Sequence, residues 1–155
     1  MDLKTAHQFF RELERMIRDL GIDTTYVEGI RSPQLGDTLR ILLPVTEEGH
    51  PVITEVMVTE FTGELDLLHL YSTVIAAFNE KAGELPRKLS EWNILCPLGA
   101  YGIYEEEGQL FHKYTFPFPR QLAAEALAEQ AMGLVELVYS ILSEKYPEIL
   151  EYAAQ

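Results

Sequence analysis

The spacing of apolar residues changes at Gly21, and this change constrains the fold more than any other feature of the sequence. Before it, apolar residues recur at the spacing of one helical face, and they are Ala6, Phe9, Phe10, Leu13, Met16, Ile17 and Leu20. Asp2 can cap this helix, and Gly21 can end it because glycine adopts a left-handed backbone without penalty. The sequence therefore predicts an N-terminal amphipathic helix over residues 3–20 that lays its phenylalanine-rich side on another layer.

Beyond Gly21 apolar and polar residues alternate, which is typical of strands with one buried face. The segment 65–76 fits both a strand and a helix, and Thr73, Val74 and Ile75 favour the strand because β-branched residues pack well in sheets. The other predicted strands in this part of the chain cover 25–28, 38–45 and 52–61. Together these segments predict an antiparallel meander.

A short helix and a β-hairpin are predicted next. Residues 84–96 place apolar side chains on one side and precede Pro97, the pattern of a helix that ends at proline. Strands are predicted over 98–105 and 109–118 because these segments flank Glu106-Glu107-Gly108, a glycine-containing turn signal.

Three prolines are expected to interrupt regular structure near the C-terminus. Pro117 and Pro119 should end the strand pairing because proline donates no backbone hydrogen bond. Residues 121–145 carry the apolar stripe of a long amphipathic helix. Pro147 should interrupt this helix before a last turn at 149–152.

The order of these elements defines an α+β fold class: N-terminal helix, antiparallel β-meander, short helix, β-hairpin and long C-terminal helix. A chain of 155 residues fits one domain, so the prediction is a single domain over residues 1–155. The chain carries 25 acidic against 12 basic residues, a net charge of −13 that repels phosphate backbones and anionic lipid. Nucleic acid and membrane are therefore not expected as partners. Charged residues near the start and the lack of an apolar stretch of ~18 residues predict a cytoplasmic protein.

Sequence motifs for catalysis or cofactor binding are absent. There is no glycine-rich nucleotide loop and no nucleophile elbow, and the histidines His7, His50, His69 and His112 lie far apart. No catalytic, cofactor-binding or metal-binding residue is therefore assigned, and no enzyme activity is predicted. Cys96 has no second cysteine to pair with and is interpreted as a small buried hydrophobe. The acidic runs at 47–48 and 105–107 are interpreted as solvated turns.

The second face of the predicted sheet carries more apolar surface than a solvated face needs. If Leu39, Ile41, Leu43 and Val45 face the helices, the opposite side presents Leu42, Met57 and Phe61. Either the protein covers this surface itself, with the helix around Trp92 or a loop, or a second subunit or client peptide does. Leu42, Met57 and Phe61 are the candidate protein-binding residues.

Several short patterns lie around the predicted hairpin. They are Trp92-Asn93, Leu98-Gly99-Ala100-Tyr101-Gly102-Ile103, an acidic-glycine turn, and the strand Leu110-Phe111-His112-Lys113-Tyr114-Thr115-Phe116-Pro117. With the element order, these patterns resemble the YbjN-like proteins and the wider type III secretion chaperone-like fold. The resemblance implies a small acidic protein, often dimeric, in a fold whose secretion-chaperone members hold an extended segment of a client. YbjN-like members share no established activity.

Three hypotheses for the function follow. The first is a non-enzymatic protein-binding module, chaperone-like or adaptor, that binds a client or forms a homodimer through the apolar sheet face or a helix surface. The second is a small-ligand-binding protein or enzyme whose pocket combines a histidine, His69 or His112, with the aromatic residues Trp92, Tyr101, Tyr104 and Tyr114. The third, a regulator that acts by sequestration, needs the same kind of surface as the first.

Overall fold

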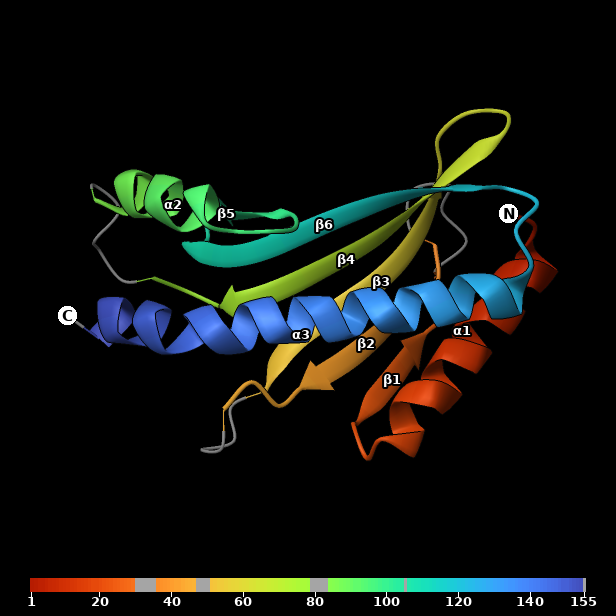
Figure 1. Cartoon of the computed structure of the whole chain (residues 1–155), viewed down its shortest axis with the longest axis horizontal. Coiled ribbons are helices and arrows are strands. Elements are labelled where there is room, and N and C mark those ends of the chain that lie inside the picture. The colour runs from red at the N-terminus through yellow and green to blue at the C-terminus, as the bar shows by residue number, and fades with distance from the viewer. Residues whose placement is uncertain (30–35, 47–50, 79–83, 105, 155) are drawn as a thin grey trace.

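A six-stranded antiparallel sheet forms the centre of the fold, with strand order β1-β2-β3-β4-β6-β5 (Figure 1). The computed structural model describes residues 1–29, 36–46, 51–78, 84–104 and 106–154. The elements, in chain order, are α1 (Leu3–Asp19), β1 (Thr24–Val27), β2 (Thr38–Leu43), β3 (Val52–Glu60), β4 (Leu65–Ile75), α2 (Leu85–Ile94), β5 (Ala100–Tyr104), β6 (Gln109–Pro119) and α3 (Ala124–Ala154). The predicted α+β class is confirmed, and the ambiguous segment that begins at Leu65 is a strand.

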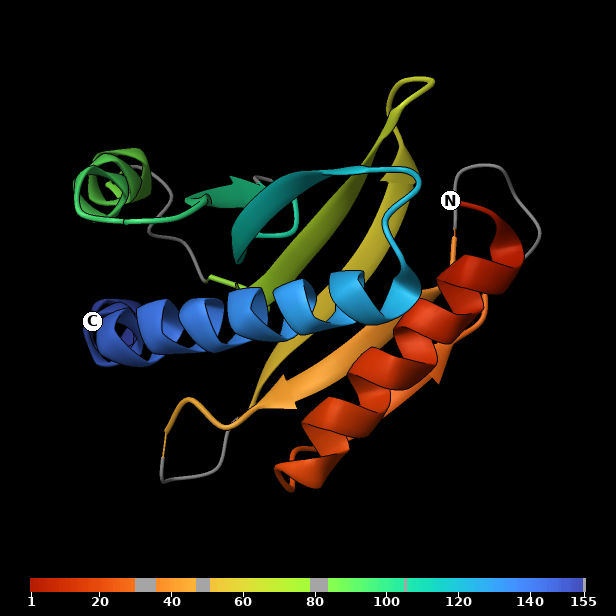
Figure 2. The same cartoon turned by 45° about the vertical axis from the view of Figure 1, so that its right-hand side comes forward.

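The helices lie on one side of the sheet. α1 and α3 pack against each other and cross the same face, and α2 lies near β5 at the C-terminal end of α3 (Figures 1 and 2). The strand residues that face α1 and α3 alternate with outward residues along the chain, as the period-two pattern predicted. Burying each large apolar side chain in this core contributes about 1.5–3 kcal/mol; the sheet contributes Leu39, Ile41, Leu43, Val52, Val56, Leu68 and Leu70, and α1 contributes Phe9, Phe10, Leu13 and Ile17.

Both predicted ends of the first helix are confirmed. The Asp2 carboxylate accepts a hydrogen bond from the Thr5 N–H at 2.8 Å, which satisfies one of the donors that a helix leaves free at its start. Gly21 follows the helix with φ 77°, and its N–H donates to the Arg18 carbonyl at 2.8 Å. The turn that follows leads into β1.

The prediction that Pro117 and Pro119 end the strand pairing is wrong. β6 continues to Pro119, and these two prolines pair with Leu67 and Leu65 of β4. The pairing tolerates them because β5 accompanies β6 only from Gln109 to Lys113. Beyond Lys113, one side of β6 has no described strand beside it. A proline nitrogen that faces this side therefore removes no hydrogen bond between strands.

The prediction that Pro147 interrupts the last helix is also wrong, since α3 runs to Ala154. Proline inside a helix removes the hydrogen bond to the carbonyl four residues earlier and costs about 3 kcal/mol. The turns beyond it bury Ile149 and Tyr152. Trp92 also packs edge-on against Tyr152 at 5.8 Å between ring centroids, and this tertiary packing compensates for the missing bond.

By length and composition alone, α3 could also cross a membrane, which the sequence analysis did not expect. Its composition has another explanation in this fold, because its apolar residues form the helical side of the core. Those buried along it include Leu127, Ala128, Ala131, Val135, Val138 and Leu142. An apolar core helix passes the same test as a membrane span.

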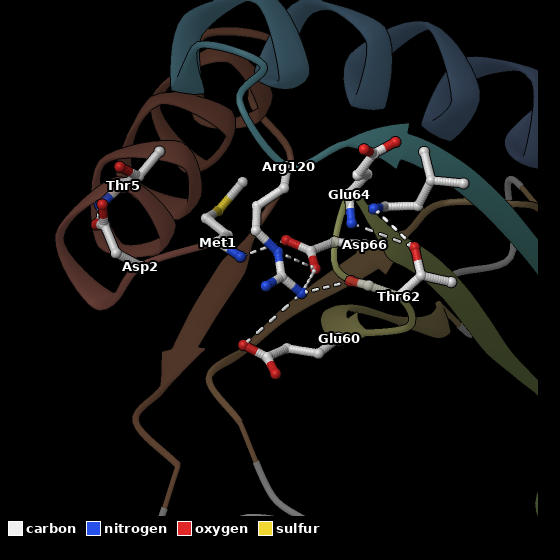
Figure 3. A network of polar contacts seen from close by, with 9 residues as sticks. Met1, Asp2, Thr5, Glu60, Thr62, Glu64, Asp66 and Arg120 are labelled. Atoms are coloured by element: carbon white, nitrogen blue, oxygen red, sulfur yellow. Dashed lines mark hydrogen bonds and ion pairs between the residues drawn. The ribbon is translucent and has the colours of Figure 1, made fainter.

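A buried carboxylate ties the start of α1 to the sheet (Figure 3). Asp66 of β4 is fully buried; its Oδ2 pairs with the amino group of Met1, and its Oδ1 accepts from Arg120 Nε at 3.1 Å and Nη2 at 2.9 Å. Burial raises the pKa of Asp66, but the hydrogen bonds from Met1 and Arg120 lower it more, so the net pKa lies below 3.8. The network joins α1, β4 and the turn between β6 and α3.

Candidate functional site

The side of the sheet that faces away from α1 and α3, called the open face below, is not crossed by any described helix (Figures 1 and 2). The strand registers arrange its side chains in rows that cross the strands. One row is predominantly apolar and runs Leu42, Ile53, Thr73, Phe111, Gly102. Ile53, the second residue of β3, is 42% exposed, so a large aliphatic side chain lies at the surface near one end of the central strands.

The neighbouring row is polar and runs Arg40, Glu55, Tyr71, Lys113, Ala100. Arg40 Nε donates to Glu55 Oε1 at 2.8 Å, and Lys113 is exposed beside Tyr71. Among the described strand residues of the open face, the charged side chains are Arg40, Glu55 and Lys113, which together carry a net charge of +1. The chain as a whole carries −13, so its acidic groups lie elsewhere.

Three aromatic rings cluster where β4, β5 and β6 meet on the open face. Phe111 stacks on Tyr71 at 5.1 Å between centroids and lies 4.9 Å from the ring of Tyr104, which is 51% exposed. Gly102 makes room for Phe111: a Cβ there would meet Cζ of the ring and lie 2.8 Å from Cε2. The Tyr71 hydroxyl donates to Gln109 Oε1 at 2.7 Å, and burial raises the pKa of this phenol, so it remains neutral. The cluster forms a fixed apolar surface.

The candidate protein-binding residues are only partly brought together. Leu42 and Met57 are half-buried and point to the open face, as predicted, while Phe61 follows the end of β3 and is 64% exposed. Leu42 pairs with Ile53, which lies four residues before Met57, and Phe61 lies four residues beyond it. At about 3.3 Å per residue these steps are about 13 Å each, so the three residues mark a line along the face, not one patch.

Sequence reasoning missed the aromatic cluster. Its members come from β4, β5 and β6, and Tyr71 is 40 positions before Phe111, so local periodicity carries no trace of their contact. The available signal was that each residue occupies an outward-facing position in the alternating pattern of its own strand. Only the register between β4 and β6 places them together.

The two histidines considered for a pocket lie on opposite faces. His69 is on the open face, where Nε2 contacts Thr59 Oγ1 at 2.7 Å and Nδ1 contacts Thr115 Oγ1 at 3.1 Å. Burial lowers its pKa, with a smaller contribution from Lys113. His112 points to the helix side. The structure therefore does not combine the two histidines in one site.

His112 is fully buried beside Cys96 and Tyr101. Its Nε2 lies 2.8 Å from the Leu98 carbonyl, which also accepts from the Cys96 thiol at 3.1 Å. Nε2–H is therefore the donor, and Nδ1 has no partner among the described residues. Burial lowers the pKa of His112 and raises that of Cys96, so both groups are neutral. A neutral thiol is a weak nucleophile, and the pair does not resemble an activated cysteine–histidine couple.

The aromatic residues of the pocket hypothesis are also divided. Trp92 and Tyr101 contact each other edge-on at 6.2 Å on the helix side of β5, whereas Tyr104 belongs to the cluster on the open face. Tyr114 is half-buried on β6 opposite Leu70. Within the part of the chain that the structure describes, no three His, Cys, Asp or Glu side chains are placed to hold a metal.

The acidic turns fall partly outside the described residues. Glu106 and Glu107 are exposed, as a solvated turn requires, while positions 47–48 and 105 are not described.

The fold and the open face define a class: a small α+β protein with one sheet face covered by helices and the other presenting an apolar row. The chain belongs to the YbjN family, whose model matches residues 11–151 and carries the description "Putative bacterial sensory transduction regulator". A search of curated proteins found no match to the chain.

The buried neutral histidine gives a testable dependence of stability on pH. Burial holds the pKa of His112 below the ordinary 6.5. In the pH window between the pKa of the folded state and 6.5, the unfolded chain therefore binds a proton that the folded chain does not. We expect the free energy of unfolding, measured by urea titration, to fall as the pH is lowered through this window. His69 acts in the same direction, so His112→Gln should reduce the slope without abolishing it.

His7→Gln is the matched control and should leave the slope in place. An unchanged slope in the His112→Gln variant would contradict the assignment of the pH dependence to the buried ring.

Proposed function

We propose that this protein is a non-enzymatic regulator that acts by binding another protein through the open face of its sheet. The observation that carries the proposal is the apolar row of Leu42, Ile53 and Phe111, which no described helix crosses. Through Phe111 this row continues into the aromatic cluster with Tyr71 and Tyr104. Contiguous exposed apolar surface of this kind commonly marks interaction sites. The family description, a regulator of sensory transduction, is compatible with such a role.

The charges indicate what kind of partner fits. The open face carries Arg40 and Lys113 against Glu55, so it is the part of an otherwise acidic molecule that accepts an acidic protein. A complementary segment would place apolar side chains on the row of Leu42 and Ile53 and a carboxylate near Lys113, because Arg40 is already paired with Glu55. Nucleic acid, with its continuous negative charge, would be repelled by the −13 of the whole chain.

The test is site-specific photo-crosslinking in living cells with a benzophenone amino acid at Thr73, between Ile53 and Phe111 on the open face. We expect a discrete adduct with a partner protein. Phe111→Asp should remove it, because losing an apolar anchor at an interface commonly costs about 2 kcal/mol or more, roughly 30-fold in affinity. Leu137→Asp is the matched control, since Leu137 is an exposed residue of α3 on the other side of the sheet, and it should leave the adduct unchanged.

The mass of the adduct identifies the partner. An adduct of twice the chain's mass means that a second copy occupies the face, as in a homodimer, and a different mass means a client. No adduct at Thr73, or one that persists at full yield in a folded Phe111→Asp variant, would contradict the proposal.

A further inference from the structure

His69 on the open face can gain or lose a proton without moving. Both of its ring nitrogens lie beside threonine hydroxyls, Nε2 at 2.7 Å from Thr59 Oγ1 and Nδ1 at 3.1 Å from Thr115 Oγ1. A hydroxyl can donate or accept a hydrogen bond. The neutral ring needs one donor and one acceptor beside it, and the charged ring needs two acceptors. The two threonines supply either combination, because each hydroxyl hydrogen only has to turn about its C–O bond.

His112 lacks this freedom. Its Nε2–H donates to the Leu98 carbonyl, which cannot become a donor, and its buried Nδ1 has no partner among the described residues. His112 also points to the helix side, so its charge would not lie on the open face. Of these two histidines, His69 is therefore the one whose protonation changes the charge of the open face.

The charged and titratable groups that face His69 come from its own strand and from the two neighbouring strands. They are Tyr71 on β4, Glu55 on β3 and Lys113 on β6. Tyr71 stays neutral because burial raises its pKa, and Glu55 is paired with Arg40. Lys113 lies diagonally from His69, at about 7–8 Å between Cα atoms. No described side chain neutralises Lys113, so it is the cation beside His69.

We propose that the open face binds an acidic partner more tightly when His69 is protonated, so that the binding responds to pH. This inference rests on the function proposed above and adds regulation to the same surface. Protonation adds one positive charge to the net +1 of the face, and a partner carboxylate near Lys113 would attract both cations.

Binding and protonation of His69 therefore favour each other. In the free protein, burial and, to a smaller extent, the charge of Lys113 hold the pKa of His69 below 6.5. A partner carboxylate offsets the repulsion between the two cations and raises this pKa. By linkage, the affinity for the partner rises as the pH falls.

The probe is a capped hexapeptide that alternates leucine and glutamate, as the apolar and charged rows of the open face require. Its Kd is measured by NMR titration of the ¹⁵N-labelled protein at about pH 5.5 and about pH 7.5, where glutamate is ionised. We expect about three- to tenfold tighter binding at the lower pH, the effect of one more charge pair at a partly exposed site. The same peptide with glutamine in place of glutamate should show no such difference.

Two pairs of variants assign the response to the ring. His69→Gln should remove the pH dependence and leave the Kd at the higher pH within about twofold. His7→Gln, on α1 at the other side of the sheet, should retain it. Thr115→Val removes one acceptor of the charged ring and should reduce the gain at the lower pH, whereas Thr73→Val on the same face should not.

The inference is overturned if the glutamate peptide binds equally at both pH values, if the glutamine peptide shows the same difference, or if His69→Gln retains it. Failure of both peptides to bind at either pH would contradict the proposed function itself, and with it this regulation.

Discussion

Replacing Asp66 with alanine is expected to lower the free energy of unfolding by about 3–5 kcal/mol, the usual cost of removing one partner from a buried ion pair. Asp66 is fully buried, and its two oxygens bind the amino group of Met1 and the guanidinium of Arg120. Without the carboxylate the Met1 amino group remains buried without its counter-charge, while Arg120, which is partly exposed, regains water. The change also disconnects the start of α1 from β4 (Figure 3).

Urea unfolding of the variant at neutral pH measures this loss, and Glu60→Gln provides the control. Glu60 also approaches Arg120, at 3.9 Å, but its side chain is exposed, so its removal should change stability by less than about 1 kcal/mol. Equal effects of the two substitutions would show that burial of the Asp66 pair contributes nothing to the fold.

Gly99→Ala is expected to destabilise the protein by about 2–5 kcal/mol, for two reasons that add. Gly99 has φ 70°, where an alanine costs about 1–2 kcal/mol. A Cβ there would also meet the Lys113 carbonyl and lie 2.9 Å from Cε1 and Nε2 of His112. Neither neighbour can move freely, because one is strand backbone and the other is a fully buried ring, and overpacking of this kind costs about 1–3 kcal/mol.

Gly21→Ala separates the two contributions. Gly21 has nearly the same backbone angle, φ 77°, but a Cβ there has nothing within 4 Å, so only the backbone cost should appear. Thermal and urea unfolding of both variants measures the difference. If Gly99→Ala costs no more than Gly21→Ala, the contact with His112 and β6 is not the reason for the glycine.

The elements of the fold could be predicted from the sequence because each depends on its own residues. The period of apolar residues identified α1 and most strands, and the β-branched residues decided for a strand in β4, where the period fitted a helix as well. The alternation along β2 and β3 placed Leu42 and Met57 on the open face. The proline predictions failed because the effect of a proline depends on its neighbours in space. Pro117 lies where β6 has a partner on one side only, and Pro147 lies in a helix whose last turn packs against Trp92.

The candidate sites were harder to predict because they combine distant segments. The aromatic cluster needs the register between β4 and β6, which α2 and β5 separate along the chain. The small pocket lined by Trp92, Tyr101 and Ile141 needs α3 to continue beside α2, and no local pattern of residues indicates that Trp92 and Ile141 face the same space. Residue types suggested an aromatic pocket, but Tyr104 and Tyr101 point to opposite sides of one strand, and only pairing with β6 decides which side is the core.

The shape of the sheet also bears on how copies of the chain avoid aggregation. A strand with free backbone groups is a template on which another chain can add, and proteins protect such positions with short strands or with proline. The outermost strands here are short, four residues in β1 and five in β5. The longer free stretch is the part of β6 beyond Lys113, and it contains Pro117 and Pro119, which cannot donate to an added strand. The two prolines that were predicted to end the strand are therefore expected to protect this side of β6, which no described strand covers, from pairing with another chain.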